Sequence, residues 1–200
     1  MKDAIAHLRQ ADPVMAGIVD RVGACLIATR EPTFETLARS ITFQQLSGKA
    51  AATIFGRLKK AVGRRFTATA FLRLSDEELR ACGLSRQKIA SLKDLAEHVA
   101  DRRINFKKLA DMTDEEVIAA LSQIRGVGVW TVQMFLIFAL KRPNVMPFGD
   151  LGVRTAIQKA YGLTGVPKPA ELLEITKSWH PYCSFATWYL WRSLDASAEV

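Results

Sequence analysis

The sequence predicts an all-α fold built from short helices. Apolar residues recur with the 3.6-residue period of a helix, no stretch alternates convincingly as a strand does, and capping residues, glycines and prolines punctuate the periodic segments. Because these signals come at short intervals, the helices are joined by short connections. The expected helices cover residues 13–25, 33–46, 48–62, 67–73, 76–82, 86–101, 114–123, 129–140, 151–161, 169–178 and 182–194.

Start and stop signals support several of these helices in chain order. Ser75-x-x-Glu78 and Thr113-x-x-Glu116 are capping boxes that open the helices at 76–82 and 114–123. The apolar run that begins at residue 129 is long enough for another helix. Helix-ending glycines and intervening prolines stand at Gly83, Gly162, Pro32, Pro143, Pro167 and Pro181.

Composition bounds the class of protein. Two hundred residues, of which 49% are hydrophobic, suit one domain or two tightly joined lobes. The longest apolar run, residues 132–140, is interrupted by Gln133 and is far shorter than the roughly 20 residues that span a bilayer. Asp3 is an acid where a signal peptide carries only positive charge. We therefore expect an intracellular protein with no membrane association.

The three cysteines argue against a metal centre or a disulfide framework. Cys25, Cys82 and Cys183 are odd in number, widely spaced and without the paired spacing of metal ligands. Buried thiols in a reducing compartment explain them better than a redox or metal role.

The charge balance favours a polyanionic partner. The formal net charge is +8 and the pI is near 9.6, and basic side chains that neutralise phosphates release condensed counterions. Three local clusters carry much of this charge, although each could be a solvated helix face, and this alternative is slightly favoured for the first two. They are Arg57, Lys59, Lys60, Arg64 and Arg65, then Arg102, Arg103, Lys107 and Lys108, and finally Arg125, Lys141 and Arg142.

A glycine turn between two expected helices is a candidate phosphate site. Gly126 and Gly128 lie one residue apart between the helices at 114–123 and 129–140. Glycines adopt backbone conformations that other residues resist, and they let a ligand approach bare amides at the start of the second helix. The alternative is that the two glycines form only a tight turn.

A single carboxylate stands at the expected start of the helix at 151–161. Asp150 follows Pro147-Phe148-Gly149 and precedes Leu151. An aspartate there is a good N-cap, and the positive potential of a helix N-terminus also favours an ionised, catalytically useful carboxylate. The two roles can coexist.

Four ordered segments together resemble the helix-hairpin-helix DNA glycosylase superfamily, and within it the 3-methyladenine DNA glycosylase II type. They are residues 41–51, 124–131, 147–151 and 179–191, so the resemblance runs from about Pro32 to Arg192. It implies two helical lobes, an active-site cleft between them and a hairpin at about residues 114–140. Residues 1–200 then form a single glycosylase unit without the additional N-terminal α/β domain that this type often carries.

The resemblance assigns DNA contacts to a loop and to the hairpin. An extruded base leaves a gap, and the loop after the helix that ends near Phe43 fills it. Gln45 stands at the position of the intercalating leucine, with Leu46 beside it, and which of them is the wedge stays open. An alternative is that the glutamines only cap a helix end. The implied DNA-binding residues are Gln44, Gln45, Leu46, Ser47, Arg125, Gly126, Val127, Gly128 and Thr131.

The resemblance also implies a base pocket. Aromatic walls suit a cationic alkylated purine, and the candidate walls are Trp130, Tyr182, Phe43, Met134 and Trp179. Tyr182 replaces the family's stacking tryptophan and Met134 replaces a pocket tyrosine. Trp188 and Trp191, in an apolar helix, fit a core position better. Cys183 stands where relatives commonly have arginine, and Arg192 is a candidate replacement.

Position 130 decides the expected reaction. Relatives that also cut the backbone have a lysine there, because an amine must form a Schiff base with the sugar, whereas this chain has Trp130. We therefore expect a monofunctional hydrolase in which Asp150 stabilises an oxocarbenium-like transition state or positions water.

No catalytic cofactor is expected, and the cysteines cannot build the iron–sulfur loop of some relatives. The resemblance further implies a Na⁺ or K⁺ ion on the backbone carbonyls of Ser122, Ile124 and Gly126.

The expected function is therefore base excision repair: hydrolysis of the N-glycosidic bond of alkylated bases such as 3-methyladenine in double-stranded DNA, by a monomer in the cytoplasm at the nucleoid. The alternatives are a non-catalytic DNA-binding module and a glycosylase for other damaged bases or with lyase activity. Asp150 and the aromatic residues favour the enzyme, since a clamp needs neither. The preferred lesion stays open.

Overall fold

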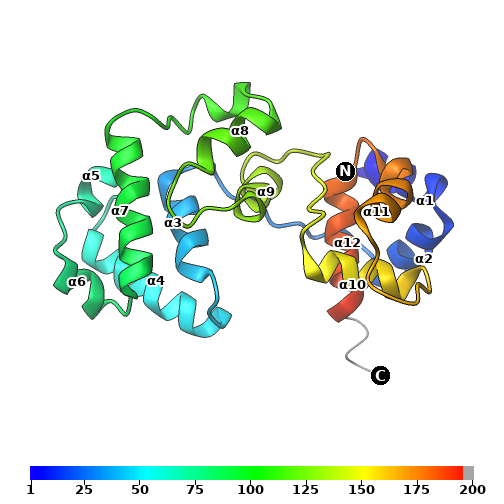
Figure 1. The fold of residues 1–200 in the computed structure, drawn as a ribbon, viewed down its shortest axis with the longest axis horizontal. Coiled ribbons are helices and arrows are strands. Elements are labelled where there is room, and N and C mark those ends of the chain that lie inside the picture. The colour runs from blue at the N-terminus through cyan, green and yellow to red at the C-terminus, as the bar shows by residue number, and fades with distance from the viewer. Residues whose placement is uncertain (196–200) are drawn as a thin grey trace. The chain divides into compact units, whose positions relative to one another are not determined.

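The computed structural model describes residues 1–195 and confirms the all-α prediction. These residues form helices and connecting turns with no strand (Figure 1). They divide into two compact units. One unit is the continuous segment Arg30–Phe135, and the other joins Met1–Thr29 to the segment that starts at Leu136. The last five residues of the predicted 1–200 unit lie outside the described part.

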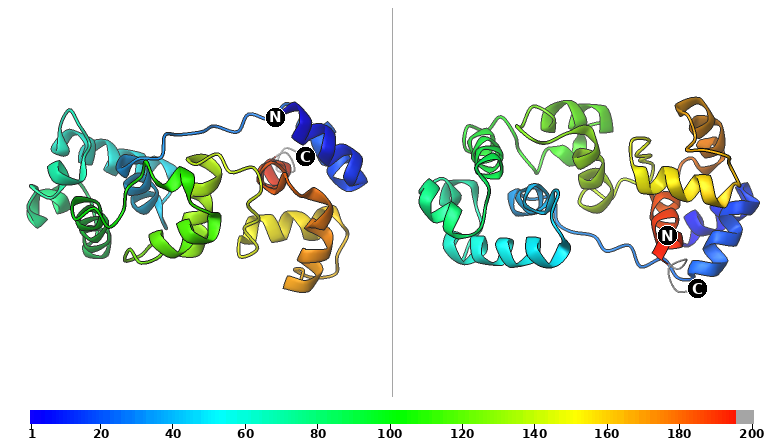
Figure 2. Two further views of the ribbon diagram at one scale, coloured as in Figure 1. Left: turned by 90° about the horizontal axis from the view of Figure 1, so that it is seen from above. Right: turned by 60° about the horizontal axis from the view of Figure 1, so that its bottom comes forward.

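The continuous unit is organised around one long helix. This helix, α7 (Arg86–Ala100), contacts α3, α5 and α6, and Figure 2 shows the group from two further sides. Its buried face carries Ile89, Leu92, Leu95 and Ala96. The remaining elements of the unit are α3 (Phe34–Phe43), α4 (Gly48–Val62), α5 (Ala68–Phe71), α6 (Asp76–Ala81), a 3-10 turn at Leu109–Asp111, α8 (Asp114–Leu121) and most of α9 (Val129–Phe138).

Both predicted capping boxes are confirmed. The Ser75 hydroxyl accepts the Glu78 amide at 3.2 Å, and the Glu78 carboxylate accepts the Ser75 amide at 2.8 Å. Thr113 and Glu116 make the same pair of bonds at the start of α8. Each box satisfies two N–H groups that the helix itself leaves without partners.

The discontinuous unit packs the two ends of the chain together. The last helix, α12 (Cys183–Asp195), contacts α10 and α2 and carries a row of buried residues that includes Trp188 and Tyr189. The other elements of the discontinuous unit are α1 (Lys2–Ala11), α2 (Pro13–Val22), α10 (Leu151–Ala160), α11 (Pro169–Thr176) and a 3-10 turn at Lys177–Trp179.

Asp12 is the polar centre of this unit. Its Oδ1 accepts the amides of Val14 and Met15 at 2.8 and 3.1 Å and so caps α2. Its Oδ2 accepts the indole N–H of Trp179 at 2.9 Å and the hydroxyl of Tyr161. Burial, together with this carboxylate, raises the pKa of Tyr161 well above its usual range, so the phenol stays a donor. Asp12 thereby joins α2, the end of α10 and the turn after α11.

Several predicted helix bounds are wrong for identifiable reasons. The helix α1 was not predicted, because no capping signal marks its start. Its N-cap residue, Met1, makes no side-chain capping hydrogen bond. The helix predicted at 13–25 ends at Val22, because Gly23 has a φ of +80°, which is not helical. The Gly23 amide donates a hydrogen bond to the carbonyl of Val19. The helix predicted at 33–46 ends at Phe43, three residues early. The helix predicted at 48–62 is confirmed at both ends, and the other predicted ends are either exact or differ by one or two residues.

The cysteine prediction agrees with the structure. Cys25, Cys82 and Cys183 are all buried free thiols. Burial raises the pKa of each thiol, that of Cys183 to about 12. In residues 1–195, no helix has both the length and the apolar character needed to cross a membrane.

We predict that Asp12→Asn destabilises the protein by about 2 kcal/mol. The new amide would place N–H groups against the Trp179 indole N–H, which has no acceptor capacity. Urea unfolding followed by tryptophan fluorescence measures the change. Asp20→Asn is the matched control, since Asp20 is an exposed partner of Arg9 in the same unit. Equal stability of the two variants would contradict the role assigned to Asp12.

Candidate functional site

The predicted hairpin is present between α8 and α9. After α8 ends, Ile124 and Val127 are buried at 1% and 4% exposure and anchor the turn, whereas Arg125, Gly126 and Gly128 are exposed. The amide of Val127 donates to the carbonyl of Ile124 at 3.0 Å. The turn therefore shows its backbone on one side and is anchored by apolar side chains on the other.

Gly126 is required by both conformation and space. Its φ is +75°, in the left-handed region, and a Cβ built on it would lie 2.6 Å from the Ser91 hydroxyl. Gly128 differs, because a Cβ there would have no atom of another residue within 4 Å. The first glycine thus serves close packing on α7, and the second leaves open space at the start of α9.

Asp94, also on α7, holds Arg125, the residue before Gly126 in the turn. Its Oδ2 accepts the backbone N–H of Arg125 at 2.7 Å. The buried imidazole of His98 lies beside it, with Nδ1 2.8 Å from the Asp94 carbonyl and Nε2 3.0 Å from the Arg103 guanidinium. Since guanidinium is only a donor, Nε2 accepts and Nδ1 carries the proton. The hydrogen bond between the Arg125 amide and Asp94 therefore holds the hairpin on α7.

The predicted wedge lies in the turn between α3 and α4. Gln45 is exposed and has φ +57°, which is uncommon for a residue with a side chain. Leu46, 38% exposed, follows it, and the hydroxyl of Ser47 accepts the Ala50 amide as the N-cap of α4. We call residues 44–47 the wedge turn. Both wedge candidates are accessible, and which of them intercalates stays a prediction.

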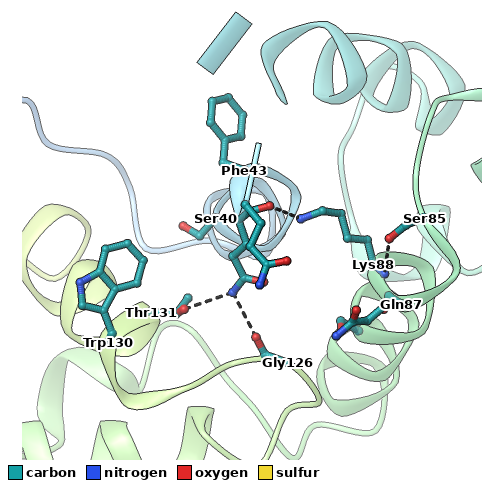
Figure 3. A pocket seen from close by; sticks show the side chains of 11 residues that line it. Ser40, Phe43, Ser85, Gln87, Lys88, Gly126, Trp130 and Thr131 are labelled. Atoms are coloured by element: carbon teal, nitrogen blue, oxygen red, sulfur yellow. Dashed lines mark hydrogen bonds between the residues drawn. The ribbon is translucent and has the colours of Figure 1, made fainter. Parts of the chain in front are cut away.

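The side chain of Gln44 joins the wedge turn to the hairpin. Its Nε2 donates to the carbonyl of Gly126 at 3.0 Å and to the hydroxyl of Thr131 at 3.1 Å (Figure 3). The Thr131 side chain is only 5% exposed, so it supports this link instead of facing DNA. The predicted DNA contact of Thr131 stays a prediction.

A cavity of about 530 Å³ opens between these elements. In Figure 3, Trp130 and Lys88 stand on opposite sides of it. Trp130 is 47% exposed, so it offers a large aromatic surface to a ligand. The other lining residues are Ser40, Phe43, Gln44, Gln45, Ser85, Gln87, Ser91, Gly126 and Thr131. The cavity thus brings together Trp130, Phe43 and four of the predicted DNA-binding residues, namely Gln44, Gln45, Gly126 and Thr131.

Phe43 is less available than the sequence suggests. The guanidinium carbon of Arg39 lies 3.7 Å from its ring centroid, and Phe55 packs against it edge-on. One ring face therefore already holds a cation, which weakens the prediction that this ring stacks on a cationic base. Met134 is half-buried on α9, and its pocket role stays a prediction.

The predicted cation site consists of the hairpin carbonyls of Ser122, Ile124 and Gly126. A cation needs several oxygens turned toward one point. Here the carbonyl of Ile124 accepts the Val127 amide and that of Gly126 accepts the Gln44 side chain, and each oxygen keeps a second lone pair that a cation could use. Residues 1–195 also contain no cluster of histidine, cysteine and acidic side chains that could hold a metal. The Na⁺ or K⁺ ion on these carbonyls stays a prediction.

Asp150 lies in the other unit, buried at 7% exposure at the start of α10. Its Oδ1 accepts the Val153 amide at 2.7 Å, which confirms the predicted N-cap. The same oxygen accepts the indole N–H of Trp191 at 3.0 Å. Gly152 permits this approach, since a Cβ there would lie 3.1 Å from Oδ1 and 3.3 Å from the Trp191 ring.

Trp191 is a site residue that sequence reasoning missed. It is half-buried and stacks on Phe138, with ring centroids 6.0 Å apart. Its position in an apolar helix favoured a core role, and its distance of 41 positions along the sequence from Asp150 hid the contact. The only available signal was that a buried indole needs an acceptor.

The two other predicted aromatic walls behave differently. Tyr182 is half-buried, with its ring 5.3 Å from that of His7 and 6.2 Å from that of Phe185, and its base contact stays a prediction. Trp179 is fully buried in the core and bonds Asp12, so its predicted role as a pocket wall is wrong. Arg192, the candidate substitute for an arginine at position 183, is exposed and pairs with Asp195.

Comparison with known families decides the class of protein. The model of the HhH-GPD superfamily of base excision DNA repair proteins matches residues 38–181. The chain belongs to this superfamily. The matched segment contains the wedge turn, the hairpin and Asp150, whereas Tyr182 and Trp191 lie just beyond it.

Individual members of the HhH-GPD superfamily agree in sequence and fold. DNA-3-methyladenine glycosylase 1 of Schizosaccharomyces pombe is 40% identical over 167 residues, which cover 82% of this chain and 73% of that protein. The structure of the S. pombe 3-methyladenine DNA glycosylase in complex with abasic DNA has a TM-score of 0.82 and 36% identity, over 94% of this chain and 95% of that one. The Bacillus halodurans DNA-3-methyladenine glycosidase also has a TM-score of 0.82, at 34% identity, over 94% of this chain and 92% of that one.

We predict opposite effects for alanine at the two hairpin glycines. Gly126→Ala is expected to lower stability by about 2–3 kcal/mol, because it combines a left-handed backbone with a clash at Ser91. Gly128→Ala has room for its methyl group and is expected to change stability by less than about 1 kcal/mol while weakening DNA binding about tenfold.

Thermal unfolding and fluorescence anisotropy with a labelled duplex measure the two effects of these variants. Gly17→Ala, in open space on α2, is the matched control. A stable Gly126→Ala variant, or full DNA affinity in Gly128→Ala, would show that the two glycines have been assigned the wrong roles.

Proposed function

We propose that this chain is a monofunctional DNA glycosylase that releases alkylated purines from double-stranded DNA by hydrolysis. The observation that carries the proposal is Asp150, a buried carboxylate held at a helix start by the Val153 amide and the Trp191 indole. A non-catalytic DNA-binding module does not need a carboxylate held in this way. The related proteins named DNA-3-methyladenine glycosylase support the same substrate class.

The chemistry assigned to Asp150 is electrostatic. When the C1′–N bond breaks, the alkylated base keeps the bonding electrons and leaves as a neutral molecule, while positive charge develops on the sugar. A fixed carboxylate stabilises this charge most strongly where water is excluded. Water then adds to C1′ and loses a proton to solvent, which leaves an abasic site. Two donors on Oδ1 fix the carboxylate plane before the reaction and so reduce reorganisation.

Trp130 supports the absence of strand cutting. A lyase step needs a primary amine that forms a Schiff base with the sugar, and an indole has none. The exposed Trp130 ring instead provides a stacking surface for an extruded base. The product of this reaction is therefore an intact backbone with one abasic site.

The proposed partner is double-stranded DNA, bound by a monomer. The net charge of +8 favours contact with phosphates, and the exposed backbone at Gly126 and Gly128 offers amides to one of them. Since its substrate is chromosomal DNA, we place its action in the cytoplasm at the nucleoid. No step of the proposed reaction depends on the Na⁺ or K⁺ ion that is expected on the hairpin carbonyls.

We predict that Asp150→Asn lowers the rate of base release from methylated duplex DNA at least about 100-fold. Asparagine caps helices about as well as aspartate, so the variant removes the charge while the fold stays intact. Free base is quantified by chromatography, and strand cuts are scored with and without alkali. We expect cuts only after alkali treatment.

The controls for this experiment separate charge from stability. Asp20→Asn removes an exposed carboxylate of the same unit and is expected to retain wild-type base release. Thermal unfolding of Asp150→Asn is expected within a few degrees of wild type. A wild-type protein that binds the duplex and releases no base would make the DNA-binding module the better account, and full activity in Asp150→Asn would remove its catalytic role.

We further predict that Trp130→Leu lowers the efficiency of base release about tenfold, whereas Trp130→Phe stays within about threefold of wild type. Leucine keeps apolar bulk but loses the π surface, and phenylalanine keeps both. The measurement is kcat/KM on methylated duplex DNA. Equal losses in the two variants would indicate that Trp130 contributes packing and no stacking.

A further inference from the structure

One face of α7 contacts two separate elements of the candidate DNA interface. Lys88, Ser91 and Asp94 follow one another at intervals of three residues, which places them along the same side of the helix. Ser91 packs on Gly126 and Asp94 holds the amide of Arg125, so both act on the hairpin. Lys88 acts on the wedge turn, and neither the hairpin motif nor Asp150 accounts for it.

Lys88 makes two hydrogen bonds with the end of α3. Its Nζ donates to the carbonyl of Ile41 at 2.7 Å and to that of Gln44 at 2.8 Å, and Figure 3 shows the side chain extending from α7 across the cavity. The last carbonyls of a helix lack intrahelical partners and carry the negative end of its dipole. Burial lowers the pKa of Lys88, so these carbonyls take the place of much of the water around its ammonium group.

The Gln44 carbonyl belongs to the peptide group that orients Gln45, the first of the two wedge candidates. That peptide group joins ψ of Gln44, which is 133°, to φ of Gln45, which is +57°. A left-handed glutamine costs about 1–2 kcal/mol, so it persists only where its surroundings hold it. Lys88 bonds the oxygen of the peptide group whose rotation would release Gln45 from this conformation.

We propose that Lys88 is a positioning residue that holds the wedge turn in the conformation needed to open duplex DNA. This inference rests on the proposed glycosylase function. Extrusion of a base from a duplex costs a few kcal/mol of stacking and pairing, and a wedge that is already oriented pays none of its ordering cost during that step. A base in a single strand needs no wedge, so Lys88 matters for duplex substrates only.

The test compares duplex with single-stranded substrate. Lys88→Met removes the donor, Lys88→Arg keeps an N–H donor, and Lys93→Met is the matched control. Lys93 lies on the same helix and pairs with Asp76 instead of α3. Single-turnover base release is measured on a methylated duplex and on the same methylated strand alone.

We expect Lys88→Met to lose about tenfold on the duplex and less than about twofold on the single strand. Lys88→Arg is expected to recover most of the duplex rate, and Lys93→Met to match wild type on both substrates. On a Gln45→Ala background, Lys88→Met is expected to add little, because a residue that acts through Gln45 has nothing left to position. Equal losses on both substrates, or full additivity with Gln45→Ala, would overturn the proposal.

A second readout does not depend on base release. A duplex with 2-aminopurine opposite an abasic site becomes more fluorescent when the wedge unstacks that base, and Lys88→Met is expected to reduce the increase at saturating protein. An unchanged increase would overturn the proposal for Lys88 even if the protein released no base. If Lys88→Met fails to fold, Lys88→Gln is measured in the same way, because its shorter side chain falls short of the two carbonyls that Lys88 reaches. Wild-type behaviour of that folded variant would also overturn the proposal.

Discussion

The part of the continuous unit expected to face DNA depends on the absence of a side chain at position 126. The Ser91 hydroxyl occupies the space that a Cβ would need, so the hairpin can approach α7 closely enough for Asp94 to reach the Arg125 amide. The same closeness leaves the Gly126 carbonyl accessible to the Gln44 amide. The hairpin and the wedge turn therefore share α7 as a common support, and the geometry of each is set by contacts with that helix.

Asp150 illustrates how capping and chemistry can share one side chain. The Val153 amide and the Trp191 indole both donate to Oδ1, which fixes the direction of the carboxyl group through a local and a distant contact. Hydrogen bonds to a charged acceptor are stronger than those between neutral groups, so this orientation is well held. Gly152 makes the arrangement possible, because any side chain there would crowd both the carboxylate and the indole ring.

Sequence reasoning succeeded where the determining contacts are local. Helical periodicity and the two capping boxes involve residues three or four positions apart, and so does the Asp150 cap. It failed where the partners are distant in sequence: Lys88 reaches back 47 residues to Ile41, and Trp191 reaches back 41 to Asp150. It also placed the end of α3 too late, since the left-handed Gln45 is sustained by tertiary contacts that no local propensity encodes. The base pocket, the cation and the choice of wedge stay predictions.

The division of the chain also has a consequence for biosynthesis. The continuous unit Arg30–Phe135 has all its contacts available once its last residue has left the ribosome. The helices α1 and α2, by contrast, pack on α12, and α1 also packs on the turn at Lys177–Trp179; both of these elements are translated only after that whole segment. At about 5–20 residues per second, the N-terminal helices wait several seconds with their apolar faces uncovered. Nascent chains of this protein therefore carry a folded hairpin-bearing unit while the unit that contains Asp150 is still incomplete.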